Sequence, residues 1–94
     1  MKNTQPHAVF AYVHRNRRVA SLVTVKADTD FSLRTDVLRE FGQAIAMHVA
    51  AIGNFDVNSD WIFDSTKKVG DILNEIRMKL GENVVVDQVH VLIS

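Results

Sequence analysis

The pattern of apolar residues changes twice along this chain, from one typical of β-strands to one typical of helices and back again. β-Branched and aromatic residues dominate Ala8 to His14, and apolar residues are frequent in Val19 to Lys26. The polar segment Arg15 to Arg18 between them predicts a turn, so we expect an antiparallel hairpin. Neither strand has a cleanly polar face, which predicts that both sides of the sheet are covered at least in part.

The first helix is predicted from about Thr35 to Ala51. Thr35 suits the N-cap position, Asp36 in the first turn favours the helix dipole, and Gly53 predicts the end of the helix. One apolar stripe at helical spacing supports this helix, and its members are Val37, Leu38, Phe41, Ile45, His48, Val49 and Ile52. Within the stripe we expect the histidine to be a core or boundary residue rather than a ligand.

The second helix is predicted from about Lys67 to Leu80, with Ser65 or Thr66 at its start and Gly81 as its C-terminal stop. Its apolar stripe consists of Val69, Ile72, Leu73, Ile76 and Leu80. The connection Asn54 to Asp64 lies between the two helices. We expect its large apolar residues to pack against the rest of the protein; these are Phe55, Trp61, Ile62 and Phe63.

A third strand, dense in valine, is predicted near Asn83 to Leu92 and completes the order β-β-α-α-β. That order predicts an α+β fold, in which a three-stranded antiparallel sheet has the helices packed on one face. The 94 residues suit a single domain over residues 1–94, in which residues 1–7 are expected to form a flexible tail.

Composition and motifs argue against several classes of function. The formal net charge is zero, which disfavours a direct nucleic-acid partner. The chain has no cysteine, no Gly-rich phosphate loop, no clustered metal-ligand spacing and no Ser/His/Asp arrangement, so we expect no catalytic site, no metal and no cofactor. The polar N-terminus and the lack of a spanning apolar run predict a cytoplasmic protein that does not contact membranes.

Eight short motifs follow one another between Tyr12 and Val86: Tyr12-Val13-His14, Arg18-Val19, Leu22-Val23, Thr29-Asp30-Phe31, Arg34-Thr35, Ile45-Ala46-Met47-His48-Val49-Ala50-Ala51, Lys68-Val69-Gly70-Asp71-Ile72 and Lys79-Leu80-Gly81-Glu82-Asn83-Val84-Val85-Val86. In this order they resemble the core domain of translation elongation factor Ts, in a minimal version. Each motif is weak by itself, and their shared order on one short chain makes the resemblance specific. The fold of that family agrees with the order of elements predicted above.

The resemblance implies a guanine-nucleotide exchange factor, a binding protein rather than an enzyme, whose partner is the GTPase elongation factor Tu. Family members insert an Asp-Phe pair into the GTPase, disturb its magnesium and phosphate region, and so release GDP. Asp30 and Phe31 match this pair, and Thr29 belongs to the same motif. His14 matches the histidine of the family's Tyr-x-His motif. Gly81 matches a family position at the partner surface and also suits a helix C-cap with positive φ.

Two placements of Phe31 are open at this point. From local chemistry alone, Phe31 packs under the sheet and Asp30 caps a turn. The resemblance favours an exposed Phe31 that serves as an apolar wedge for a partner pocket. The two placements differ in the effect of Phe31→Ala: a core residue would lose roughly 3–5 kcal/mol of stability, whereas an exposed one would leave the fold intact.

The chain departs from the family pattern in three ways. Because the first strand is predicted within ten residues of Met1, we expect the family's small N-terminal helical domain to be absent; the region between the two helices has shrunk to Asn54 to Asp64, and Asp87-Gln88 stand where the family has paired arginines. These differences remove contact area. They leave two alternatives to an exchange factor: a non-exchanging adaptor or decoy that holds the GTPase through the same surface, and a structural homodimerisation domain without a GTPase partner.

A homodimer through the open sheet face is also predicted. Two helices cover only one face of the sheet, and a second copy is the simplest cover for the other. In the family two core units pack together, so Asp30 and Phe31 of one chain would join His14 of the other. The alternative is a monomer whose aromatic connection folds over the open face. The residues expected on that face are Phe10, Tyr12, Leu22 and some of the valines from Val84 to Val91.

Overall fold

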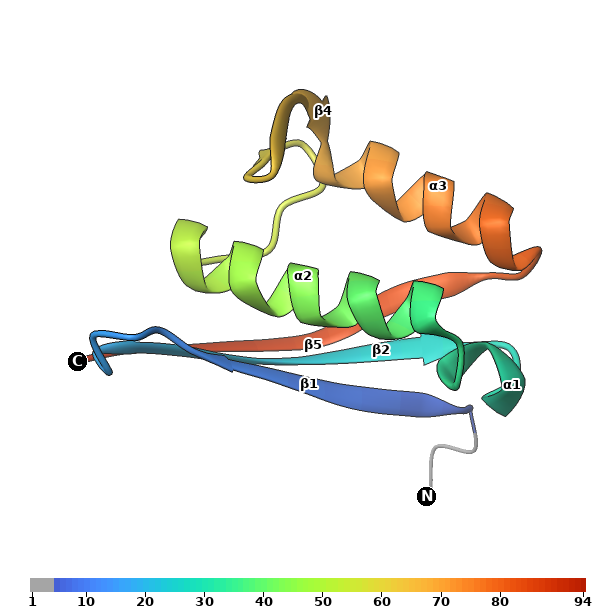
Figure 1. Ribbon diagram of the computed structural model, residues 1–94, viewed down its shortest axis with the longest axis horizontal. Helices are drawn as coiled ribbons and strands as arrows, with labels where there is room; N and C mark the ends of the chain where they lie inside the picture. The colour runs from blue at the N-terminus through green and yellow to red at the C-terminus, as the bar shows by residue number, and fades with distance from the viewer. Residues whose placement is uncertain (1–4) are drawn as a thin grey trace.

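The computed structural model describes residues 5–94 and has the α+β architecture predicted from the sequence (Figure 1). Three antiparallel strands form the main sheet in the order β1-β2-β5, and they are β1 (His7–Val13), β2 (Val19–Ala27) and β5 (Val84–Ile93). The predicted hairpin is β1 and β2, with Val13 opposite Ala20 and His7 opposite Lys26. The first four residues of the predicted tail lie outside the described residues. Of the others, Pro6 accepts a hydrogen bond from the Ala27 amide and His7 begins β1.

Two long helices lie on the same face of this sheet, α2 (Asp36–Ile52) and α3 (Val69–Leu80) (Figure 1). Their ends follow the expected local chemistry. The Thr35 hydroxyl accepts a hydrogen bond from the Leu38 amide at 3.2 Å, as an N-cap does. Gly53 (φ 95°) and Gly81 (φ 71°) end the two helices in the left-handed conformation that glycine adopts without strain.

Two small elements were not predicted. A single helical turn, α1 (Asp30–Leu33), follows β2, and a small hairpin of β3 (Asp60–Trp61) and β4 (Asp64–Lys68) precedes α3. The predicted helix start at Ser65 or Thr66 is therefore wrong. The Asp64 carboxylate accepts hydrogen bonds from the amide and hydroxyl of Thr66, and these bonds favour a turn over a helix at this point.

The core lies between the sheet and the two long helices. The inner face of β2 contributes Ser21, Val23, Val25 and Ala27, all buried, and these side chains pack under the stripe of α2. His48 belongs to this core, as predicted: its side chain is fully buried and its ring stacks on Trp61 with 5.0 Å between centroids. The aromatic connection thus packs on the helical side, so the alternative in which it covers the open face is wrong.

No segment of residues 5–94 covers the opposite face of the sheet, but the prediction of which residues lie on that face is partly wrong. Phe10 and Tyr12 point toward the helices and pack against the core, as do Val86, Val89 and Val91. The alternation of side chains along β1 did not indicate which of its two faces is turned toward the core, because both faces carry apolar residues. The open face carries Val9 (60% exposed), Val13 (64%), Leu22 (50%) and Leu92 (71%).

Candidate functional site

The Thr29-Asp30-Phe31 segment lies at the start of α1, at one end of the sheet (Figure 1). Thr29 is the N-cap, and its hydroxyl accepts a hydrogen bond from the Ser32 amide at 3.3 Å. The Phe31 ring is 78% exposed, so the placement under the sheet is wrong. Within residues 5–94 no hydrogen bond or ion pair engages the exposed Asp30 carboxylate. Both side chains are therefore available to a partner.

The backbone under this exposed pair is well anchored. Ser32 is 2% exposed, and its carbonyl accepts hydrogen bonds from the Thr35 hydroxyl at 2.7 Å and the Thr35 amide at 3.1 Å. These contacts join α1 to the N-cap of α2. A large apolar side chain held outward by a fixed backbone has the character of an interface anchor, because little conformational entropy remains to be lost on binding.

The turn after α3 meets the start of α1 across 53 residues of sequence. Glu82 accepts hydrogen bonds from the Thr29 amide at 2.9 Å and from the Thr29 hydroxyl at 3.0 Å. Hydrogen bonds from the Ser32 side chain and from Thr29 hold the pKa of the Glu82 carboxyl below its ordinary value. Gly81 precedes Glu82, so the structure brings Gly81 to the same end of the sheet as Thr29 and Phe31.

His14 lies at the opposite end of the sheet, in the turn that joins β1 to β2. Its Nδ1 atom is 2.9 Å from the Tyr12 hydroxyl. The nine residues of β2 separate this turn from α1, so at roughly 3.3 Å per residue the two ends are about 25–30 Å apart. One chain therefore does not bring His14 to Phe31. A groove beside His14 is lined by Tyr12, Asn16, Val19, Met47, Ala50, Ala51 and Ile62.

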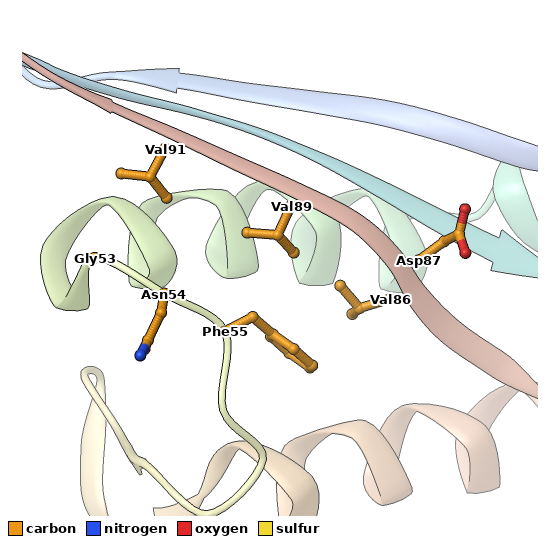
Figure 2. A pocket seen from close by; sticks show the side chains of 7 residues that line it. All are labelled: Gly53, Asn54, Phe55, Val86, Asp87, Val89 and Val91. Atoms are coloured by element: carbon orange, nitrogen blue, oxygen red, sulfur yellow. The ribbon is translucent and has the colours of Figure 1, made fainter.

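A second hollow, of about 400 Å³, lies between the edge strand β5 and the segment that follows α2 (Figure 2). Val86, Val89 and Val91 point into it from β5, and Phe55 lies opposite them. The Asp87 carboxylate points away and forms an ion pair with Lys26 at 3.4 Å. Its lining combines these apolar side chains with Asn54, and Asp87 is the one titratable residue among the seven that line it, so the hollow does not have the group of acids, bases or nucleophiles that a catalytic site needs.

His48 is the one buried histidine among the described residues, and its chemistry is structural. Its Nδ1 atom accepts a hydrogen bond from the Ile62 amide at 3.3 Å, which places the ring proton on Nε2. Burial lowers the pKa of the imidazole, so the neutral form is favoured. Over residues 5–94 no group of three His, Asp or Glu side chains is arranged to hold a metal ion. Within the same residues no helix has the length and apolarity needed to span a membrane.

Sequence reasoning found Thr29, Asp30, Phe31 and Gly81 at this end of the molecule, and it missed Asp28 and Glu82. The amide of Asn83 donates to the Asp28 carboxylate at 2.9 Å, which gives a second connection beside the one from Glu82. The Gly-Glu-Asn motif was visible in the sequence. Its contact with residues 28 and 29 depends on the β2–β5 pairing, which places Ala27 opposite Val84.

The three-stranded antiparallel sheet, with two long helices on one face and an exposed aromatic at the β2–α1 junction, defines a small domain of the α+β class. The family model described as "Elongation factor TS" matches residues 1–62, so the chain belongs to the elongation factor Ts family.

Proteins named elongation factor Ts are among its relatives. That of Thermotoga petrophila is 26% identical over 130 aligned positions, which cover 88% of this chain and 65% of the relative. That of Rubrobacter xylanophilus is 45% identical over 51 residues, covering 54% of this chain and 26% of the relative. That of Bdellovibrio bacteriovorus is 32% identical over 80 residues, covering 83% of this chain and 25% of the relative. The chain thus spans between a quarter and about two thirds of the length of these relatives.

Proposed function

We propose that this protein binds elongation factor Tu through the exposed start of α1 and promotes the release of GDP during translation elongation in the cytoplasm. The observation that carries the proposal is the Phe31 ring, 78% exposed on an anchored helical turn, in a chain of the elongation factor Ts family. Asp30 beside it adds a carboxylate that makes no bond within residues 5–94. The partner-binding residues in this proposal are Thr29, Asp30, Phe31, His14 and Gly81.

Exchange of this kind needs no covalent chemistry. A factor that binds the nucleotide-free GTPase more tightly than the GDP-bound form weakens GDP binding by the same factor, since the two equilibria are linked. Phe31 would fill an apolar pocket of the partner, and Asp30 would bring a negative charge close to the region that holds magnesium and phosphate. Repulsion between that charge and the phosphates would favour release of the nucleotide.

We also propose that the complete partner surface requires two copies of the chain. His14 and Phe31 lie at opposite ends of one sheet, with the nine residues of β2 between them. The uncovered face has apolar rows across the strands: Val13, Ala20 and Leu92 form one row, and Ala11 and Leu22 belong to the next. If two such faces pack with their strands running in opposite directions, the His14 end of one copy lies near the Phe31 end of the other.

The proposed exchange is tested by following the release of a fluorescent GDP analogue from elongation factor Tu, with and without the protein. Acceleration that saturates with protein concentration is the expected result. Binding without acceleration would identify an adaptor or decoy that holds the GTPase through the same surface. No binding at all would leave a structural homodimerisation domain.

The two-copy site is tested by mixing two inactive variants, Phe31→Ala and His14→Ala. A mixed dimer holds one intact combination, the wild-type Phe31 of one copy and the wild-type His14 of the other. If copies exchange freely in an equal mixture, half of the dimers are mixed and each has one of its two sites intact. About a quarter of the wild-type activity should then return. No recovery would refute the shared site, because a site within one chain is defective in every copy.

A further inference from the structure

Two carboxylates connect the turn between α3 and β5 to the start of α1. One carboxylate lies in the turn and accepts from the start of α1, and the other lies just before α1 and accepts from the turn. Glu82, in that turn, accepts hydrogen bonds from the Thr29 amide at 2.9 Å and the Thr29 hydroxyl at 3.0 Å. Asp28, just before α1, accepts a hydrogen bond from the Asn83 amide at 2.9 Å. Each segment thus supplies both a carboxylate and a backbone donor to the other. We call these four residues, 28, 29, 82 and 83, the clasp.

We propose that Glu82 is a positioning residue, which through the clasp fixes the exposed Phe31 relative to the α3–β5 turn. This inference rests on the proposed function, because fixing Phe31 affects activity only if a partner binds the ring. Glu82 itself is not assigned a contact with the partner.

Phe31 needs such a support because its own packing supplies little. Its ring is 78% exposed, and α1 contains only four residues. A single helical turn is unstable by itself, since several dihedral angles are fixed for very few hydrogen bonds. The position of the ring therefore depends on what holds the two ends of α1. Ser32 and Thr35 hold the C-terminal end, and the N-terminal end is held at Thr29.

The Thr29 hydroxyl transmits the effect of Glu82 into α1. A hydroxyl has one proton to donate and lone pairs with which to accept. Here it donates to the Glu82 carboxylate at 3.0 Å and accepts from the Ser32 amide at 3.3 Å. Because Glu82 receives the proton, the lone pairs of the oxygen are left for the helix. Removing the carboxylate frees the hydroxyl to rotate and weakens the N-cap of α1.

Both oxygens of Glu82 accept hydrogen bonds from Thr29, which explains why a carboxylate suits this position. Oε1 accepts from the backbone amide at 2.9 Å and from the hydroxyl at 3.3 Å, and Oε2 accepts from the hydroxyl at 3.0 Å. In Glu82→Gln one of the two oxygens is replaced by an NH₂ donor, so part of this set of hydrogen bonds is lost and part is kept. We expect a graded series, in which Glu82→Gln has a smaller effect than Glu82→Ala.

The test compares Glu82→Ala with the matched control Glu75→Ala. Glu75 lies on α3, and its carboxylate forms an ion pair with Lys67 of β4 at 2.9 Å. The first readout is hydrogen exchange of the Thr29 and Asn83 amides by NMR. The second is the protein concentration that half-saturates GDP release from elongation factor Tu. Glu82→Ala should speed exchange at Thr29 and raise the half-saturating concentration about three- to tenfold, because the partner must then order the wedge itself. Glu75→Ala should change neither.

A double-mutant cycle with Phe31→Ala separates positioning from a general loss of structure. The readout of the cycle is the affinity for elongation factor Tu, which Phe31→Ala weakens but leaves measurable; if Glu82 acts by placing Phe31, Glu82→Ala does not lower this affinity further once the ring is absent. Additive losses, or an unchanged Thr29 amide, would overturn the proposal. Failure of the wild-type protein to bind elongation factor Tu would refute the proposed function alone, because the amide measurement still decides whether Glu82 holds α1.

Discussion

Replacing Phe31 with alanine should impair partner binding while leaving the fold almost unchanged. Full burial of a phenylalanine side chain contributes about 1.5–3 kcal/mol. Phe31 is 78% exposed, so about a fifth of that contribution is present, or roughly 0.5 kcal/mol. For a domain of this size the corresponding fall in Tm is about 2–4 °C.

The effect on binding should be much larger than the effect on folding. A phenylalanine presents about 150–250 Å² of surface, most of which is free here. Burying that free part in a partner pocket contributes about 3–5 kcal/mol at about 25 cal/mol per Å², as an upper bound. Interface anchors typically lose at least about 2 kcal/mol on truncation, which corresponds to a loss of about 30-fold or more in affinity.

Two controls calibrate the comparison. Phe63, in the turn between β3 and β4 and remote from α1, is 53% exposed, so Phe63→Ala removes an exposed aromatic ring away from the site and should leave GDP release unchanged. Leu38 is fully buried, so Leu38→Ala should lower the free energy of unfolding by about 2–5 kcal/mol. A Phe31→Ala protein that melts like Leu38→Ala, or that releases GDP as fast as wild type, would refute the reasoning.

Three further changes test other parts of the structure. Leu22→Glu on the open face, 50% exposed, should give a mass near 10.6 kDa by light scattering if wild type is a dimer, whereas Met78→Glu should remain dimeric. Burial lowers the pKa of His48 in the folded state, so the unfolded state binds more protons. The free energy of unfolding should therefore fall as the pH drops through about 6.5, by at most about 1.4 kcal/mol per pH unit. His48→Leu should flatten this pH dependence when urea unfolding is measured between pH 7.5 and 5.5. Gly81→Ala and Gly53→Ala both place a side chain at positive φ and should each lower stability by about 1–2 kcal/mol, and only Gly81→Ala should also slow GDP release.

The sequence predicted those elements whose apolar pattern is long enough to repeat. The helices α2 and α3 have 17 and 12 residues, and the predicted spans Thr35 to Ala51 and Lys67 to Leu80 lie within two residues of their ends, although Ser65 or Thr66 was the wrong start signal for α3. The turn α1 has four residues, too few for a helical period to show. Strand β4 is almost entirely polar and exposed, so it had no alternation to detect. Both faces of strand β1 carry apolar side chains, and only the packing of Phe10 against α2 determines which face is turned toward the core.

In the candidate site, too, local motifs could be recognised in the sequence, whereas contacts between distant segments could not. A local motif identified Asp30 and Phe31, because both lie within three consecutive residues. The motif does not determine their exposure, because exposure depends on the tertiary contacts that anchor Ser32. Glu82 could not be found from local pattern, because its partner Thr29 is 53 residues away and the two meet only through the β2–β5 pairing.

The arrangement also explains how the chain can differ in length from its relatives and still present an exposed, anchored Phe31. The alignment with the Thermotoga petrophila protein spans 130 positions, more than this chain has residues, so the relative carries additional residues within the aligned region. The resemblance implies that such residues lie between the two long helices. In this protein that segment and the small β3–β4 hairpin lie at the end of the helical layer remote from α1 (Figure 1). The supports of Phe31 come instead from Thr35, Asp28 and the α3–β5 turn. Shortening the connection therefore leaves the geometry that presents Phe31 unchanged, and under the proposed function we expect it to lower the affinity for elongation factor Tu more than the ability to displace the nucleotide once the complex has formed.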